Sequence, residues 1–313
     1  MTVQVLLGDC RDVLRTLPGE SVHCCVSSPP YFGLRDYGHE GQIGLEPTPD
    51  EFVAEMVGVF REVRRILVSD GTLWMNLGDS YANDGKWGGH TGGKHAAALH
   101  ASPIGRNKRY TGLKPKDLIG IPWRVAFALQ ADGWYLRQDI IWHKPNPMPE
   151  SVRDRCTKAH EYVFMLSKSG RYFFDAEAVA EPVTQSTVDR VNQPTIETQQ
   201  GSNRVPGKTN GAMKAVGGAE TRNRRSVWSI TTQPFSEAHF ATMAPELAET
   251  CIKAGCPKDG TVLDPFGGAG TTGLVADRLQ RNAILIELNP EYAAMAERRI
   301  FNDAPLFAGG AAQ

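Results

Sequence analysis

Short apolar runs and longer amphipathic stretches alternate through the first 180 residues of the chain. Residues 3–7 and 22–26 are short and rich in Val, Leu and Cys, which predicts buried strands. Residues 49–67 carry apolar side chains every three or four positions, which predicts an amphipathic helix. The same patterns predict further strands at 72–77, 135–142 and 160–167, helices at 10–17 and 122–132, and a turn at 69–71.

The last third of the chain repeats this alternation. Strands are predicted at 261–263 and 282–286, and helices at 246–254, 271–279 and 290–300. Strands that alternate with helices form parallel sheets covered by helices on both faces. The pattern therefore predicts an α/β fold with a doubly wound, mostly parallel sheet.

Two regions break the alternation. Residues 83–115 are rich in Gly, His and basic side chains, have no sustained period, and are expected to form a long mobile loop. Residues 181–225 are rich in Gln, Asn, Thr and Gly, so they cannot bury much core alone and are expected to be irregular. They form either a solvated linker or a surface that becomes ordered on a polyanion.

Composition narrows the class of protein. The 313 residues are 41% hydrophobic with a net charge of −1, which suits a globular domain and excludes a uniformly basic nucleic-acid coat. No apolar run reaches the ~20 residues of a membrane-spanning helix, and the N-terminus lacks the layout of a signal peptide. The six cysteines form no CxxC pair, so we expect reduced thiols, a cytoplasmic location and no membrane partner.

A glycine-rich turn joins a predicted strand to a predicted helix at 264–270. Its glycines let backbone approach a ligand closely, and the following helix offers free N–H groups to an anion. Glu287 ends the next predicted strand, where a carboxylate can hold ribose hydroxyls. This acid favours a nucleoside cofactor site over the alternative, a tight structural turn. The candidate residues are Asp264, Pro265, Phe266, Gly267, Gly268, Gly270, Thr271 and Glu287.

Ser28, Pro29, Pro30 and Tyr31 follow the predicted strand at 22–26. Open α/β sheets bind ligands at the carboxyl ends of their strands. The two prolines fix the backbone and remove two N–H donors, which leaves the Ser28 hydroxyl and the Pro29 carbonyl as acceptors beside an aromatic face. This set suits a planar amine that donates two hydrogen bonds and stacks on a ring. The alternative is a turn with a packed tyrosine.

Together the two motifs resemble those of site-specific DNA methyltransferases that modify exocyclic amino groups. The catalytic tetrapeptide of that family is Asp, Asn or Ser followed by Pro-Pro and an aromatic residue, as at 28–31. Its cofactor motif is similar to residues 264–270, and the order, catalytic tetrapeptide first, is that of the permuted beta class. The resemblance implies a Rossmann-like fold, S-adenosylmethionine as cofactor, and double-stranded DNA whose target base is flipped out of the helix.

The resemblance also implies roles for residues outside the two motifs. Asp9 resembles the acidic residue near the cofactor adenine, and Pro245 lies in a segment similar to the helix start near the methionine carboxylate. Residues 142–147 resemble the segment beside the target base. The expected organisation is a catalytic half at 1–180, a target-recognition insertion at 181–225 and a cofactor-binding half at 226–313.

The resemblance gives the irregular regions a function, because the family places target recognition between the two halves. Their basic side chains are then expected to neutralise DNA phosphates. The sequence leaves open which of them read bases, and whether a second copy of the chain or a cognate restriction endonuclease is a further partner. The expected DNA contacts are Lys86, Lys94, Arg106, Lys108, Arg109, Lys144, Arg204, Lys208, Arg222, Arg224 and Arg225.

The target atom is the exocyclic nitrogen of cytosine or adenine. Serine at the first tetrapeptide position is associated in the family with N4 of cytosine, whereas Asp and Asn are associated with N6 of adenine. Cytosine is favoured and adenine stays open, because all three side chains accept the same hydrogen bond. The faces of Tyr31 and Phe266 are expected to stabilise the sulfonium by about 0.5–2 kcal/mol. A catalytically silent DNA-binding protein of the same fold is the alternative function.

No metal is expected to take part. His90, His95 and His100 are five residues apart, which is not a ligand spacing on one helix face. The stretch from Gly88 to Lys94 resembles a phosphate-binding loop, but His95 follows where such a loop needs Ser or Thr.

Overall fold

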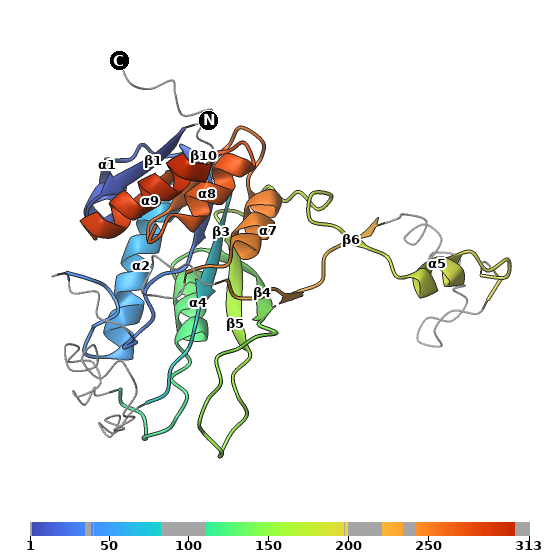
Figure 1. Cartoon of the computed structure of the whole chain (residues 1–313), viewed down its shortest axis with the longest axis horizontal. Helices are drawn as coiled ribbons and strands as arrows, with labels where there is room; N and C mark the ends of the chain where they lie inside the picture. Colours follow the sequence, from blue (N-terminus) through green and yellow to red (C-terminus); the bar gives the residue numbers. More distant parts are fainter. Residues whose placement is uncertain are drawn as a thin grey trace. The chain divides into compact units, whose positions relative to one another are not determined.

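The computed structural model describes residues 2–34, 39, 41–82, 111–196, 198–199, 221–233 and 242–303 (Figure 1). By the contacts between its residues the chain divides into two units. The larger unit comprises Met1–Phe174 and Val227–Gln313, and the smaller unit comprises Asp175–Ser226.

The larger unit is built, within its described residues, on an eight-stranded sheet in the order β1-β10-β9-β2-β3-β5-β4-β8. The strands from β1 to β3 in this order pair in parallel, and β8 pairs in parallel with β4. Only β5, among these strands, runs antiparallel to both of its neighbours. The bounds are β1 Val3–Leu7, β2 Val22–Ser27, β3 Leu67–Leu77, β4 Tyr135–His143, β5 His160–Ser167, β8 Val227–Ser229, β9 Thr261–Asp264 and β10 Asn282–Glu287.

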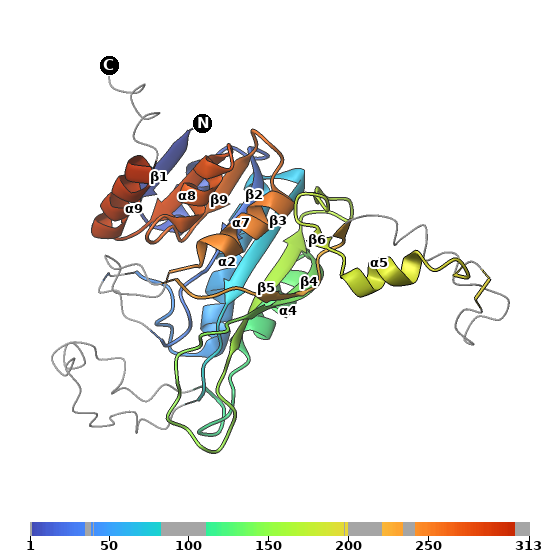
Figure 2. The same cartoon turned by 45° about the vertical axis from the view of Figure 1, so that its right-hand side comes forward.

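Helices cover both faces of the sheet (Figure 2). One group is α1 (Cys10–Thr16), α2 (Pro49–Ile66) and α4 (Ile121–Ala131). The other group is α7 (Pro245–Gly255), α8 (Thr271–Arg278) and α9 (Pro290–Asp303). This arrangement confirms the predicted doubly wound α/β fold. No helix in the described part of the chain is long and apolar enough to cross a membrane.

Helix α2 shows how the sequence builds this architecture. Thr48 and Glu51 form a reciprocal capping box at its start, and Pro49 occupies the first turn, where no N–H partner is needed. Phe52 and Phe60 belong to its apolar stripe and are fully buried against the sheet. Burial of each such side chain contributes roughly 1.5–3 kcal/mol, so tertiary packing holds this helix in place.

The chain reverses its winding between β9 and β2. From β2 it passes through α2 to β3 on one side, and from β9 it passes through α8 to β10 on the other. Strands β2 and β9 are parallel neighbours, with Cys24 opposite Val262 and Cys25 opposite Leu263. In open α/β sheets a crevice forms at such a switch point, beyond the carboxyl ends of the strands. Both candidate motifs follow these two strands.

The predictions were wrong in two places. Residues 69–71 continue strand β3 instead of forming a turn, and a register shift in the pairing of β2 with β3 accommodates them. The region 181–225 is not irregular throughout, because it contains helix α5 (Gln185–Val191) and a pair of short antiparallel strands, β6 (Glu181–Pro182) and β7 (Thr221–Arg222). Val191 and Ile196 are buried in this region.

Candidate active site

Asp264, at the carboxyl end of β9, organises the glycine-rich turn. It is 3% exposed and accepts hydrogen bonds from the Ser27 hydroxyl at 2.6 Å, the Thr272 hydroxyl at 2.7 Å and the Phe266 backbone N–H at 3.1 Å. Burial raises the pKa of this carboxyl to about 6, although the hydrogen bonds oppose the rise. Asp264 therefore ties β9, the turn and the first turn of α8 to the end of β2.

The glycines of the turn allow close packing. Gly270 has a φ of +77°, and a Cβ there would lie 2.8 Å from the Cβ of Ala296 in α9. The Gly267 backbone N–H donates to the Ile286 carbonyl at 2.8 Å, which holds the turn against β10. Gly270 thus serves the packing of α8 against α9, because a side chain has no room at that position.

Glu287 ends β10 beside this turn. Its two carboxylate oxygens accept the backbone N–H groups of Gly268 and Asn289, each at 2.8 Å. Burial raises the pKa of this carboxyl, and these hydrogen bonds oppose the rise. Each carboxylate oxygen has a second lone pair, so Glu287 can still accept hydroxyl groups from a ligand.

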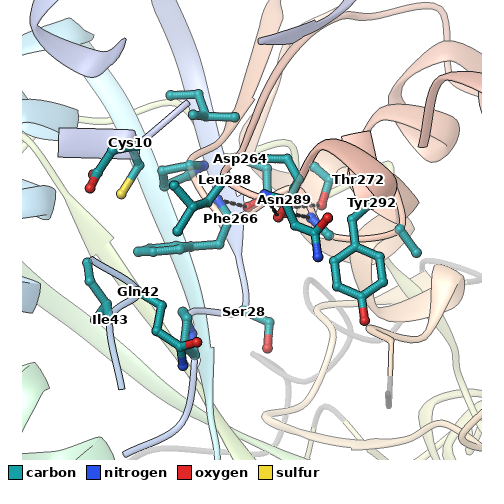
Figure 3. Close-up of a pocket in the computed structure, with 18 of the residues that line it drawn as sticks. Cys10, Ser28, Gln42, Ile43, Asp264, Phe266, Thr272, Leu288, Asn289 and Tyr292 are labelled. Atoms are coloured by element: carbon teal, nitrogen blue, oxygen red, sulfur yellow. Dashed lines mark hydrogen bonds between the residues drawn. The ribbon is translucent and has the colours of Figure 1, made fainter. Parts of the chain in front are cut away.

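A pocket of about 190 Å³ lies over this edge of the sheet (Figure 3). Phe266 lies in it between Leu288 and the segment of Gln42 and Ile43. Ser28 and Pro30 of the tetrapeptide line the same pocket, whereas Pro29, Tyr31, Pro245 and Gly270 do not. The other predicted cofactor residues all line it: Asp9, Asp264, Pro265, Phe266, Gly267, Gly268, Thr271 and Glu287.

Asp9 lines the pocket and caps α1. Its carboxylate accepts the Arg11 backbone N–H at 2.8 Å and the Arg11 side chain at 3.0 Å. Arg11 also donates to Glu55 at 3.1 Å. Burial favours the neutral form of Asp9, but the hydrogen bonds and charge of Arg11 outweigh it and lower the pKa. Asp9 therefore remains ionised, with its charge balanced by a neighbour.

The tetrapeptide begins directly after β2. The Ser28 hydroxyl donates to Oδ1 of Asn76 at 3.3 Å, and the Tyr31 hydroxyl donates to Oε2 of Glu161 at 2.8 Å. Beneath the Tyr31 ring lies Gly78, where a Cβ would come 2.8 Å from the ring carbon Cδ2 and closer still to Cε2. The ring is therefore held between its hydrogen bond and a glycine backbone.

Sequence reasoning missed Asn76 and Glu161. Asn76 lies near the carboxyl end of the apolar strand β3 and is 3% exposed. A polar residue in an apolar strand needs hydrogen-bond partners when it is buried, and this was the available sequence signal. It donates to Oε2 of Glu161 at 3.2 Å and to the Tyr162 carbonyl at 3.1 Å. Glu161, in β5, is ion-paired with Lys144. No local pattern distinguished Glu161, because the pairing of β5 with β3 brings it to Asn76 and the pairing of β5 with β4 brings it to Lys144.

Four of the predicted DNA contacts lie among the described residues. Lys144 is 18% exposed, is paired with Glu161, and lies 4.3 Å from the centre of the Trp142 ring. In the smaller unit, Arg222 and Arg225 both pair with Glu181, at 3.5 and 2.9 Å, and Arg224 lies between them in the sequence. The remaining predicted contacts lie outside the described residues: Lys86, Lys94, Arg106, Lys108, Arg109, Arg204 and Lys208.

The described side chains also define what else the site contains. The described ranges contain no group of three or more His, Cys, Asp or Glu side chains that could hold a metal ion. Cys24 and Cys25 lie buried in β2, and burial raises the pKa of both thiols. These two thiols are therefore protonated core groups.

The comparisons with known proteins decide the family. A family model described as DNA methylase matches residues 22–298. The chain belongs to this DNA methylase family. It is 45% identical over 298 residues to the Type II methyltransferase M.SmaI of Serratia marcescens, covering 95% of this chain and 90% of the relative. It is 47% identical to M.XycI of Xanthomonas campestris pv. cyanopsidis over 293 residues, covering 94% and 86%.

Solved structures agree with this assignment. TTHA0409 of Thermus thermophilus, complexed with S-adenosyl-L-methionine, is 25% identical, with a TM-score of 0.58 and 98% of each chain covered. The cytosine-N4-specific PvuII DNA methyltransferase, at 20% identity, shares the fold, with a TM-score of 0.62 and 97% and 92% covered. The DNA methylase is therefore an S-adenosylmethionine-dependent DNA methyltransferase, as predicted.

Proposed function

We propose that this DNA methylase methylates N4 of a cytosine flipped out of double-stranded DNA, with N6 of adenine as the second candidate. The observation that carries the proposal is the position of Ser28. It lines the cofactor pocket, and its hydroxyl hydrogen is directed to Asn76, 3.3 Å away. The lone pairs of the Ser28 oxygen are then available to an amino group. Serine at this position favours cytosine through the resemblance described above.

The pocket residues fit the cofactor. Glu287 offers carboxylate lone pairs to ribose hydroxyls, while Ile43 and Leu288 offer apolar surface to a purine ring. Phe266 offers a ring face to a sulfonium cation, an attraction of about 0.5–2 kcal/mol. When bound, S-adenosylmethionine would supply the methyl group, which would pass from its sulfonium sulfur to the target nitrogen.

The tetrapeptide orients the amine. With the Ser28 hydroxyl and the Pro29 carbonyl each accepting one amine hydrogen, the nitrogen becomes pyramidal and its lone pair, no longer delocalised into the ring, is free for the methyl group. Orientation of the two reactants is worth roughly 7–11 kcal/mol, so holding the nitrogen in line is the main contribution of these residues. One proton of the amine leaves to solvent after transfer.

We further propose that residues 181–225, which make up most of the smaller unit Asp175–Ser226, are the target-recognition insertion, between the catalytic half at 1–180 and the cofactor-binding half at 226–313 in the sequence. Basic side chains such as Arg222 and Arg225 are the proposed phosphate contacts. The Type II names of the relatives support a role in restriction-modification beside a cognate endonuclease, in the cytoplasm where the DNA lies. Sedimentation of the full chain tests the homodimer that the sequence leaves open.

One experiment tests the target. The wild type and a Tyr31→Ala control are expressed in a host that does not methylate its DNA, and the nucleosides are identified by mass spectrometry. N4-methylcytosine in the wild type alone is the expected result. N6-methyladenine would instead assign the second candidate, and neither product, together with retained DNA binding, would indicate a catalytically silent protein.

A further inference from the structure

A chain of polar side chains runs from Lys144 to Ser28. Lys144 is ion-paired with Oε1 of Glu161. The other oxygen of Glu161 accepts the Asn76 side-chain amide at 3.2 Å, and Oδ1 of Asn76 accepts the Ser28 hydroxyl at 3.3 Å. The side chains of Lys144 and Glu161 are only 18% and 16% exposed, so the pair lies mostly away from solvent.

Each hydrogen bond in this chain has a defined direction. The Tyr162 carbonyl and the Glu161 carboxylate can only accept, so both require the NH2 group of Asn76 to face them, and they lie 3.1 and 3.2 Å from it. The oxygen of Asn76 must then face Ser28. The Ser28 hydroxyl donates to that oxygen, and its lone pairs remain for a target amine.

Lys144 determines that Glu161 acts as a hydrogen-bond acceptor. A lysine ammonium only donates, so it requires an acceptor oxygen from Glu161. Its position 4.3 Å from the centre of the Trp142 ring holds it in place, by a cation–π contact. The neutral alternative, a glutamine at 161, has one acceptor and one donor end and cannot satisfy both Lys144 and Asn76.

We propose that Lys144 and Glu161 are positioning residues that make Ser28 a hydrogen-bond acceptor for the target amine. This proposal rests on the function proposed above. It gives Lys144 a role inside the site, different from the phosphate contact that the sequence predicted. Glu161 also accepts the Tyr31 hydroxyl at 2.8 Å, so the same carboxylate orients the aromatic ring and the acceptor.

Glu161→Gln is the first test variant. With Lys144 present, the amide oxygen of the new glutamine faces the ammonium, and its NH2 group faces the NH2 of Asn76. Asn76 then either keeps two donors face to face or turns its own NH2 toward Ser28. Turning would direct the Ser28 hydroxyl hydrogen at the target amine. At saturating DNA and cofactor, kcat is expected to fall about tenfold to a hundredfold, with unchanged cofactor affinity.

The second variant carries Lys144→Met as well as Glu161→Gln. Without the ammonium, the glutamine is free to turn its oxygen toward Asn76 and Tyr31, which restores the direction of every bond. The double variant is therefore expected to have a kcat at least about fivefold above that of Glu161→Gln alone, a difference of about 1 kcal/mol. A lysine that only contacts phosphate gives no such recovery, because its loss would weaken DNA binding and leave the kcat at saturating DNA no higher than that of Glu161→Gln.

Glu150→Gln is the matched control, because Glu150 also forms a half-buried ion pair, with Arg155, outside this chain of residues. Its kcat is expected to equal that of the wild type, and turnover is expressed per cofactor-binding site measured by calorimetry, which corrects for misfolded enzyme. A Glu161→Gln enzyme within twofold of wild type, or a double variant at or below Glu161→Gln, would overturn the proposal. Failure of the proposed function is distinct, since the wild type would then form no methylated nucleoside.

Discussion

The hydroxyl of Ser27 donates a 2.6 Å hydrogen bond to Oδ1 of Asp264, across 237 positions of the sequence. Ser27 ends β2 and precedes the tetrapeptide at 28–31, while Asp264 ends β9 and begins the glycine-rich turn. Both side chains are buried, at 0% and 3% exposure. A single bond between neighbouring strands thus joins the proposed amine-binding motif to the proposed cofactor-binding motif.

This bond predicts that two adjacent serines have separable functions. Ser27→Ala leaves the buried carboxylate of Asp264 with one donor fewer, so the free energy of unfolding is expected to fall by about 1–3 kcal/mol in urea titrations. Ser28→Ala removes the amine acceptor, so kcat is expected to fall at least about tenfold while stability changes by less than about 0.5 kcal/mol. Equal loss of stability in both variants would contradict this division.

Asp264 also predicts a pH dependence of stability. Burial raises its pKa from 3.8 to about 6, so the folded protein binds this proton more tightly than the unfolded chain does. The resulting contribution to stability is complete below about pH 4 and is lost as the pH rises through about 6. Asp264→Asn should remove this part of the slope in denaturation curves measured from pH 4 to 8. A slope identical to that of the wild type would show that Asp264 is not the titrating group.

The sequence predicted the fold because its periodicities are local. Alternating strands and helices specified a doubly wound sheet, and both motifs were visible as short contiguous runs. Asn76 and Glu161 had no such signal, since strand pairing across β3, β5 and β4 creates their contacts. Likewise Ser27 followed the predicted strand at 22–26 without any distinguishing pattern, and its partner Asp264 is defined only by the placement of β9 beside β2. What the sequence lacked was the order of strands in the sheet.

Gly78 is predicted to control turnover without affecting cofactor binding. In Gly78→Ala the new Cβ would lie 2.8 Å from Cδ2 of the Tyr31 ring and closer still to Cε2, so the ring must move and its hydrogen bond to Glu161 must lengthen. A drop in kcat of at least about tenfold is expected, with unchanged cofactor affinity by calorimetry. Gly58→Ala in α2 is the control, since nothing lies within 4 Å of its Cβ, and it should stabilise the protein by about 0.5–1 kcal/mol.

Glu287 is predicted to determine cofactor affinity. Glu287→Ala removes a carboxylate that holds the N–H groups of Gly268 and Asn289, so the dissociation constant of S-adenosylmethionine should rise about tenfold to a hundredfold. Burial raises the pKa of Glu287, and the protonated group accepts hydrogen bonds poorly. As the solution is acidified, the affinity of the wild type for S-adenosylmethionine should therefore begin to fall while the pH is still above the usual carboxyl range. Titration calorimetry of both enzymes measures this, and a pH-independent affinity would exclude Glu287 as the ligand.

The proposed DNA contacts of the smaller unit predict a change in salt dependence. Each phosphate neutralised contributes about −0.9 to the slope of log affinity against log salt concentration. Replacing Arg222, Arg224 and Arg225 by glutamine should therefore make the slope shallower by about 1–3 in fluorescence anisotropy titrations. Arg222 and Arg225 share the carboxylate of Glu181 in the free protein, so DNA must compete with this acid. The change in slope should therefore lie toward the lower end of this range.

Arg137→Gln supplies the control for this measurement. Arg137 is exposed near the amino end of β4, whereas the pocket lies at the carboxyl ends of β2 and β9. Its loss should therefore leave the slope unchanged. Glu181→Gln tests the competition directly. It releases both arginines from their counter-charge, and DNA should then bind more tightly at low salt. An unchanged slope in the triple variant would exclude these arginines from the DNA interface, because a charge that contacts phosphate must displace counterions.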